Sequence, residues 1–315
     1  MADLEGRDVV TMLDINRAEM DFIFDLADEM EITLRERTKT DLLADKVLAT
    51  AFFQASTRTR LSFESAMQRL GGSVTGFSDP KMTRAGDFYQ ESVEDTGKML
   101  ESYADVVVIR HPREGAPAEM ARAIEIPVIS GGDGYNEHPT QALLDVYTIR
   151  REKGGVEGLH IGLAGDMNIR VMHSLPIALA RYHTRVSLIS PKEMRLPTEW
   201  RQRVGDAGLA FDEVQTVEEV LPTLDVLYLI PAETSSFHAA RSEAAEDKGL
   251  SPAGFIVNDD LLAKAKADLI VLHPLPRGRE MPKSFDANNA ARYFKQAYYG
   301  VAVRMALLAL VLGRG

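Results

Sequence analysis

Five consecutive residues, Ser56-Thr57-Arg58-Thr59-Arg60, interleave hydroxyl groups with two guanidinium groups. Both kinds of group donate hydrogen bonds, and a guanidinium pairs with phosphate in a charge-assisted, often bidentate way. A capped helix with two surface arginines is the alternative interpretation, but the cluster directly follows an apolar stretch typical of a buried strand. The residue types and their spacing therefore predict a site for a phosphate or another dianion.

The elements on either side of this cluster predict a strand-to-helix turn. Residues 46–53 are apolar, as in a buried strand, and residues 61–70 carry apolar side chains at helical spacing. Gly71 and Gly72 then form a helix stop signal. At such a turn, free backbone N–H groups and the positive end of the helix dipole favour an anion.

Two further polar groups follow predicted strands in the same half of the chain. Residues 105–110 form an apolar run that ends at Arg110, and residues 126–130 lead through a glycine-rich turn to His138 and Gln141. The predicted helices between and after these strands are 91–103, 118–124 and 142–151. This alternation indicates parallel strands with right-handed crossovers, and such sheets bind ligands at the carboxyl ends of their strands. We therefore expect the three polar groups to converge.

The second half of the chain repeats the alternation. Its predicted strands are 159–165, 185–189, 225–230 and 268–273. The expected fold class is α/β, with two doubly wound parallel-sheet domains and the active site in the cleft between them. We expect one domain at 1–148, completed by an apolar C-terminal helix at 291–315, and a second domain at 149–290. Residues 235–248 form a polar stretch that predicts a loop.

Composition restricts the classes of function. A chain of 315 residues suggests two domains, and a net charge of −11 argues against general nucleic-acid binding. The absence of cysteine excludes disulfides and thiolate chemistry and fits a cytoplasmic setting. The sequence contains no run of 18 or more apolar residues, so no membrane span is predicted. No histidine pair has metal-ligand spacing, and the turn at Gly165 lacks the three-glycine nucleotide fingerprint, so we expect neither metal nor cofactor.

Several motifs, in this order along the chain, resemble those of the aspartate and ornithine carbamoyltransferases, and most closely the aspartate branch. They are Phe53-Gln-Ala-Ser-Thr-Arg-Thr-Arg-Leu-Ser-Phe-Glu64, Arg110-His-Pro112, Gly132-Asp-Gly134, His138-Pro-Thr-Gln-Ala-Leu-Leu-Asp145 and His273-Pro-Leu-Pro276. The Leu-Leu-Asp ending and His-Pro-Leu-Pro favour the aspartate branch over the ornithine branch. The two prolines near residue 275 are expected to hold backbone carbonyls in a fixed geometry, for which a cis bond is one option.

This resemblance implies carbamoyl transfer from carbamoyl phosphate to an amino acceptor. It implies that the phosphate is held by four consecutive residues, Ser56, Thr57, Arg58 and Thr59. Arg110 would bridge the phosphate and the carbamoyl oxygen, while His138 would bind the carbamoyl carbonyl. Gln141 and the Leu275 carbonyl would bind the carbamoyl amine. Arg58, Arg110 and His138 would be the catalytic residues.

On the acceptor side, the resemblance assigns Arg170 to a carboxylate of the amino substrate, next to Leu275 and Pro276. The family's aspartate enzymes carry an Arg-x-Gln-x-Glu-Arg motif after the strand that corresponds to 225–230, whereas this chain reads Pro-Ala-Glu-Thr-Ser-Ser-Phe there. No arginine occurs after that strand until Arg241. Gln54 also stands where an acidic residue usually precedes Ala-Ser-Thr-Arg.

Three interpretations of the function follow. The first is an aspartate carbamoyltransferase of pyrimidine biosynthesis, with the second carboxylate held by Arg241, Arg277 or Arg279. The second is a carbamoyltransferase for a different small amino or amide acid. The third is a non-catalytic paralogue with a structural or regulatory role, which is less consistent with an intact set of phosphate ligands.

The family also implies a homotrimer with shared active sites, and a regulatory or dihydroorotase subunit is a further partner to consider. A loop of the neighbouring subunit would complete each site. In this chain the corresponding segment is 79–91, where Lys81, Thr83 and Arg84 are the candidates.

Overall fold

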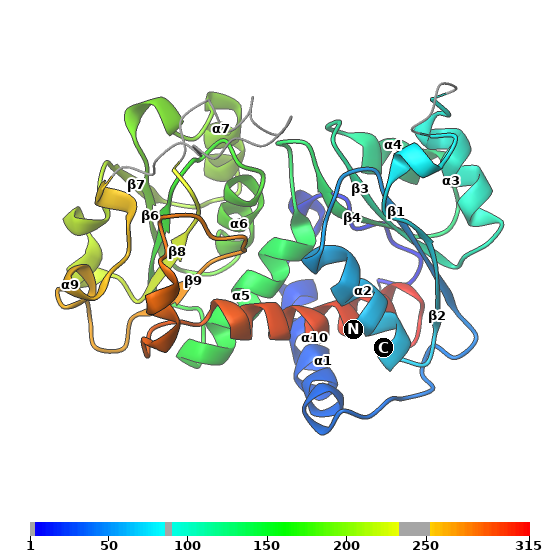
Figure 1. Cartoon of the computed structure of the whole chain (residues 1–315), viewed down its shortest axis with the longest axis horizontal. Helices are drawn as coiled ribbons and strands as arrows, with labels where there is room; N and C mark the ends of the chain where they lie inside the picture. The colour runs from blue at the N-terminus through cyan, green and yellow to red at the C-terminus, as the bar shows by residue number, and fades with distance from the viewer. Residues whose placement is uncertain (1–3, 86–89, 233–252) are drawn as a thin grey trace. The chain divides into compact units, whose positions relative to one another are not determined.

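A computed structural model describes residues 4–85, 90–232 and 253–315. The chain divides into two compact units, one made of Met1–Tyr147 and Ala297–Gly315 and the other of Thr148–Gln296. Each unit contains a sheet in which every paired strand is parallel (Figure 1). The predicted α/β class with two parallel sheets is therefore confirmed.

The sheet of the first unit has the strand order β2-β1-β3-β4. Its strands are β1 (Val47–Phe52), β2 (Ser73–Phe77), β3 (Val106–His111) and β4 (Val128–Asp133). The helices of this half are α1 (Arg17–Glu36), α2 (Arg58–Arg69), α3 (Val93–Glu101), α4 (Ala116–Ala123) and α5 (Pro139–Lys153). Helices α5 and α10 (Tyr293–Val311) contribute residues to both units.

Both faces of the central strands β1 and β3 are buried, which explains why these strands read as continuous apolar runs. One face packs against α3 and α4 in a core that contains Ala51, Ile109, Leu100 and Met120. Side chains alternate along a strand, so Leu48 points to the opposite face of the sheet, where it is also fully buried.

The sheet of the second unit has the order β7-β6-β5-β8-β9. Its strands are β5 (His160–Ala164), β6 (Arg185–Ile189), β7 (Phe211–Val214), β8 (Val226–Leu229) and β9 (Ile270–Leu272). The helices in its described residues are α6 (Val171–Leu179), α7 (Thr198–Asp206) and α9 (Asp259–Leu262). The sequence predicts four of these strands. The fifth, β7, pairs only with β6 at the sheet edge, and its half-exposed, partly acidic sequence lacks the apolar run of a buried strand.

Two helices begin three residues earlier than the sequence predicts. Helix α2 begins at Arg58 instead of residue 61, so three of the five residues of the polar cluster form its first turn. Helix α5 begins at Pro139 instead of residue 142, directly after His138. Proline suits a first helical position because its φ angle is already helical and it lacks the N–H that would remain unpaired there.

Helix α10 confirms the predicted apolar C-terminal helix, and residues 302–311 are buried on every side. Within the described ranges, no helix is long and apolar enough to cross a membrane. The predicted 235–248 loop lies outside the described residues.

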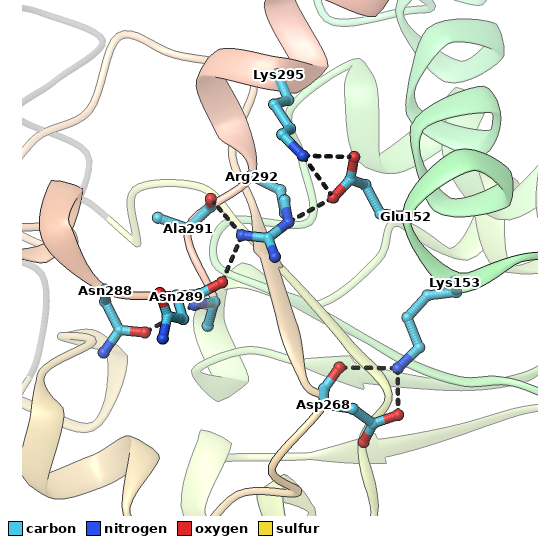
Figure 2. A network of polar contacts seen from close by, with 9 residues as sticks. Glu152, Lys153, Asp268, Asn288, Asn289, Ala291, Arg292 and Lys295 are labelled. Atoms are coloured by element: carbon cyan, nitrogen blue, oxygen red, sulfur yellow. Dashed lines mark hydrogen bonds and ion pairs between the residues drawn. The ribbon is translucent and has the colours of Figure 1, made fainter.

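A polar network within the second unit joins the end of α5 to the residues around the start of α10 (Figure 2). Glu152 accepts hydrogen bonds from Arg292 and Lys295, and Lys153 binds the carboxylate of Asp268 at 2.7 Å. Arg292 also donates to the carbonyl oxygens of Asn289 and Ala291. The Glu152 carboxylate is largely buried, so these contacts compensate its loss of solvation.

The turn between β5 and α6 requires a glycine at position 165. Gly165 has φ of +132°, and a Cβ atom there would lie 2.4 Å from the Ile230 carbonyl oxygen. We predict that Gly165→Ala lowers the free energy of unfolding by at least about 2 kcal/mol, through strain and overlap. Urea denaturation measures this. Gly158→Ala is the matched control, because Gly158 also has positive φ (+73°) but open space around it; equal losses in the two variants would contradict the steric explanation.

Candidate active site

The pairing of β1, β3 and β4 places the polar groups of the first unit at one edge of its sheet. Phe52 pairs with Arg110, and His111 pairs with Asp133. The chain leaves β1 toward α2 and leaves β4 toward α5 at this same edge. Thr59 and His138 are in contact there, with 3.3 Å between the Thr59 Oγ1 and His138 Nε2 atoms.

The start of α2 presents hydrogen-bond donors. The first helical bond runs from the Leu61 N–H to the Thr57 carbonyl, so the preceding amides have no partner within the helix. The Thr57 side chain makes no capping bond to them. Arg58 forms no ion pair within the described residues, and partial burial lowers the pKa of its guanidinium without discharging it at neutral pH. These features suit an anion.

The two arginines of the polar cluster differ in their partners. Arg60 forms an i,i+4 ion pair with Glu64 at 3.3 Å, and Glu64 also accepts a hydrogen bond from Thr50 on β1. The charge of Arg60 is therefore already balanced, whereas no described residue balances that of Arg58.

Arg110 is held in place at the end of β3. Its side chain is buried, and its Nη1 atom donates to the Gly131 carbonyl on β4 at 3.0 Å. A buried guanidinium with one donor already fixed is oriented before any ligand binds, which lowers the cost of ordering it.

Two buried carboxylates shape the loop that carries His138. Asp133 accepts hydrogen bonds from the Gly115 amide at 2.7 Å and from the Asn136 side chain at 3.1 Å. Glu137 accepts from the Met12 amide at 2.9 Å and from the Thr11 hydroxyl. Asp133 lies in the Gly132-Asp-Gly134 motif, but the sequence patterns assigned no role to either carboxylate. The Asp133–Asn136 spacing is a recognisable turn signal, but no local pattern reveals a partner of Glu137 that lies 125 residues away.

Gln141 lies in the first turn of α5, three residues after His138. Its Nε2 atom donates to Asp145 Oδ1 at 2.8 Å. Both His138 and Thr59 are 5% exposed, whereas Gln141 is half-buried. The first unit thus brings together Thr59 and His138 directly and places Arg58, Arg110 and Gln141 on the elements that meet at the same edge.

The second unit carries the remaining predicted residues at the carboxyl ends of its own strands. Arg170 is half-buried in the turn between β5 and α6, and Leu275 and Pro276 follow β9. The Leu275–Pro276 bond is cis, and Leu275 has φ of +57°.

A buried His–Glu pair holds the Leu275 backbone. The Leu275 amide donates to His273 Nδ1 at 2.8 Å, so the ring proton resides on Nε2, which donates to Glu280 at 3.0 Å. Glu280 also accepts from the Gly278 amide. Burial acts to raise the pKa of Glu280, but the hydrogen bonds from His273 and Gly278 outweigh it, so the pKa is lowered.

The arginines considered for a second substrate carboxylate are not equivalent. Arg277 binds both carboxylate oxygens of Asp286, and this hydrogen bonding lowers the pKa of Asp286 to about 2. Arg279 is exposed and forms no ion pair within the described ranges. Arg241 lies outside the described residues.

The segment after β2 is only partly described, because residues 86–89 lie outside the structure's described ranges. Lys81 is exposed in a short 3-10 helix, Pro80–Met82, that Asp79 caps. The Thr83 hydroxyl donates to the Pro80 carbonyl at 2.8 Å, and Arg84 is exposed. Among the described side chains, no group of three His, Cys, Asp or Glu residues could hold a metal ion.

Glu280→Gln tests the support of the Leu275 backbone. A carboxylate whose folded pKa is depressed stabilises the fold above its ordinary pKa of 4.5 and loses that contribution as pH falls through the folded value. We predict that the free energy of unfolding of the variant is about 1–3 kcal/mol lower than that of the wild type at pH 7, and that this difference shrinks steadily below about pH 4.5. Urea denaturation at several pH values measures it. Glu218→Gln, at an exposed ion pair with Lys264, should change stability by less than about 0.5 kcal/mol; a pH-independent loss in Glu280→Gln would contradict the assignment.

Comparisons with known proteins agree with this geometry along the whole chain. Residues 7–151 match the carbamoyl-phosphate-binding domain of the aspartate/ornithine carbamoyltransferases, and residues 157–311 match their Asp/Orn-binding domain. The chain is 46% identical to the aspartate carbamoyltransferase catalytic subunit of Thermococcus gammatolerans, over 99% of each chain. It is 43% identical to that of Methanopyrus kandleri over the full length of both.

A solved structure is also similar. The aspartate transcarbamoylase of Trypanosoma cruzi, in complex with N-(phosphonacetyl)-L-aspartic acid, is 34% identical with a TM-score of 0.89, over 99% of this chain and 98% of that one. Both halves of the chain match, in the same order. The chain therefore belongs to the aspartate/ornithine carbamoyltransferase family.

Proposed function

We propose that this protein transfers the carbamoyl group of carbamoyl phosphate to the amino group of L-aspartate, giving N-carbamoyl-L-aspartate and phosphate, a step of pyrimidine biosynthesis. The observation that carries the proposal is the uncommitted Arg58 guanidinium at the start of α2, on the same element as the Thr59–His138 contact. Relatives named aspartate carbamoyltransferase catalytic subunit match the full chain at 46% and 43% identity.

In the proposed site, the first unit binds carbamoyl phosphate. Its phosphate accepts hydrogen bonds from the start of α2, namely from Ser56, Thr57, Arg58 and Thr59. Arg110 reaches both the phosphate and the carbamoyl oxygen, and His138 donates to that oxygen. Gln141 and the Leu275 carbonyl oxygen bind the carbamoyl amine.

The reaction is an acyl transfer without a covalent enzyme intermediate. The neutral amine attacks the carbamoyl carbon, and a C–N bond forms as negative charge builds on the carbonyl oxygen. Arg58, Arg110 and His138 stabilise that charge because they are already oriented toward it. The C–O bond to the phosphate then breaks, and the leaving phosphate takes up the proton of the amine.

The second unit binds the acceptor in this proposal, with Arg170 on one carboxylate. Fewer protein groups are available to bind the second carboxylate of the acceptor, because Arg277 is already paired with Asp286 and no arginine lies between residues 231 and 240. These observations favour a second candidate, carbamoyl transfer to a different small amino or amide acid.

The proposal further includes cytoplasmic action and a homotrimer whose neighbouring subunit contributes Lys81, Thr83 or Arg84. A regulatory or dihydroorotase subunit would be an additional partner.

Arg58→Ala tests the phosphate site. We predict a fall in kcat/KM of at least about 100-fold, because the variant loses a charge that acts on the reacting group, while its thermal unfolding stays close to that of the wild type. Arg69→Ala removes the same charge from the other end of α2, where the Arg69 side chain hydrogen-bonds the Thr38 carbonyl and forms no ion pair among the described residues, and should retain activity. Activity of Arg58→Ala equal to that of the control would remove Arg58 from the site.

The acceptor is identified by phosphate release from carbamoyl phosphate across a panel of small amines, amino acids and amides that includes aspartate. We predict saturable turnover with aspartate, and a rise in its KM of at least about tenfold in Arg170→Ala, because a charged carboxylate contact is lost. Turnover with another acceptor alone would establish the second candidate. Binding of carbamoyl phosphate with no turnover on any acceptor would contradict both.

A further inference from the structure

The side-chain amide of Gln141 has two polar groups that differ chemically, an oxygen that accepts hydrogen bonds and an NH2 that donates them. Its Nε2 atom donates to Asp145 Oδ1 at 2.8 Å, one helical turn further along α5. Within the described part of the chain, Gln141 Oε1 accepts no hydrogen bond. The side chain is half-buried, so this oxygen is available to a ligand at the site edge.

An ionised Asp145 permits only this orientation. A carboxylate accepts and cannot donate, so turning the amide over would place Gln141 Oε1 against a negatively charged oxygen. Asp145 is 0% exposed, and a buried carboxylate keeps its charge only with a compensating partner.

Arg304 on α10 is a buried positive charge that interacts with the charge of Asp145. It is 3% exposed, and its guanidinium lies over the ring of Phe63 on α2, 5.0 Å from the ring centre. Burial lowers the pKa of Arg304 to about 10, while the negative charge of Asp145 acts to raise it, so the guanidinium stays charged at neutral pH. Asp145 on α5 and Arg304 on α10 are thus both buried in the first unit, where their charges interact.

We propose that Asp145, kept ionised by Arg304, is a positioning residue that fixes the Gln141 amide so that its carbonyl oxygen accepts a hydrogen bond from the carbamoyl NH2 group. This inference rests on the proposed function. A protonated Asp145, unlike the carboxylate, could donate a hydrogen bond to Gln141. The amide would then turn its NH2 toward the substrate NH2, and two donors would face each other.

Two stable ligands isolate this contact. Phosphonoacetamide keeps the primary amide of carbamoyl phosphate, with CH2 in place of the bridging oxygen, and acetonylphosphonate carries a methyl group in place of the NH2. The ratio of their dissociation constants measures the amide contact alone, because both share the phosphonate. Isothermal titration gives this ratio for the wild type, Asp145→Asn, Gln141→Ala and the double variant.

We expect the wild type to prefer phosphonoacetamide and Asp145→Asn to lose about tenfold of that preference, with acetonylphosphonate affinity within about twofold of the wild type. In the Gln141→Ala background, Asp145→Asn should change the ratio by less than about twofold, because Asp145 acts through Gln141. A loss shared equally by both ligands, or an equal change of the ratio in both backgrounds, would overturn the inference.

A chemical rescue adds a measurement whose result would not change if the role of Asp145 were only structural. In the double variant Gln141→Glu/Asp145→Asn, the new amide at position 145 donates to one oxygen of the new carboxylate at position 141, and the other oxygen of that carboxylate still accepts from the ligand amide. We expect the ratio to return toward the wild-type value, and its failure to rise above that of Asp145→Asn would count against the inference.

Arg304→Met is the second variant, which leaves Asp145 in place but removes its counter-charge. It should lose the same preference as Asp145→Asn; full retention of the ratio would overturn the role of Arg304. Circular dichroism checks that each variant is folded. A wild type that binds both analogues equally well would also overturn the inference, whereas a wild type that binds neither analogue better than inorganic phosphate would instead overturn the proposed function itself.

Discussion

Parallel hydrogen bonding between β1, β3 and β4 is the constraint on which the first unit depends. Because the strands run in the same direction, their carboxyl ends share one edge, and three segments far apart in the sequence leave the sheet there. Thr59 and His138, 79 residues apart, are in contact for this reason. The same arrangement in the second unit places the turn at Arg170 and the segment at Leu275 along the edge of its sheet.

The arginines show that residue type alone does not determine a role. Arg60 is balanced by Glu64, and Arg277 is balanced by Asp286. Arg304 is buried against the ring of Phe63 and interacts with the charge of Asp145. Arg58 has no such partner within the described residues, and this difference in pairing, rather than a difference in residue type, makes it the candidate phosphate ligand.

Buried carboxylates hold several of the binding segments in place. Asp133 and Glu137 fix the loop before His138, Glu280 fixes the ring of His273 below Leu275, and Asp145 binds the Gln141 amide. Each accepts hydrogen bonds from groups that would otherwise turn freely, so the conformational cost is met during folding and not during binding. These acidic residues contribute to the site without being expected to touch the substrate.

The sequence by itself determined the α/β class, both parallel sheets and the polar cluster at 56–60, because apolar runs, helix stop signals and strand–helix alternation are local patterns. It did not reveal β7, whose edge position leaves it without an apolar run, nor the early starts of α2 and α5. Only the tertiary structure decided which arginines are balanced and which carboxylates support the loops. Glu137 and Met12, or Asp145 and Arg304, lie more than 100 residues apart, and burial creates their interaction by removing the solvent that would otherwise weaken it.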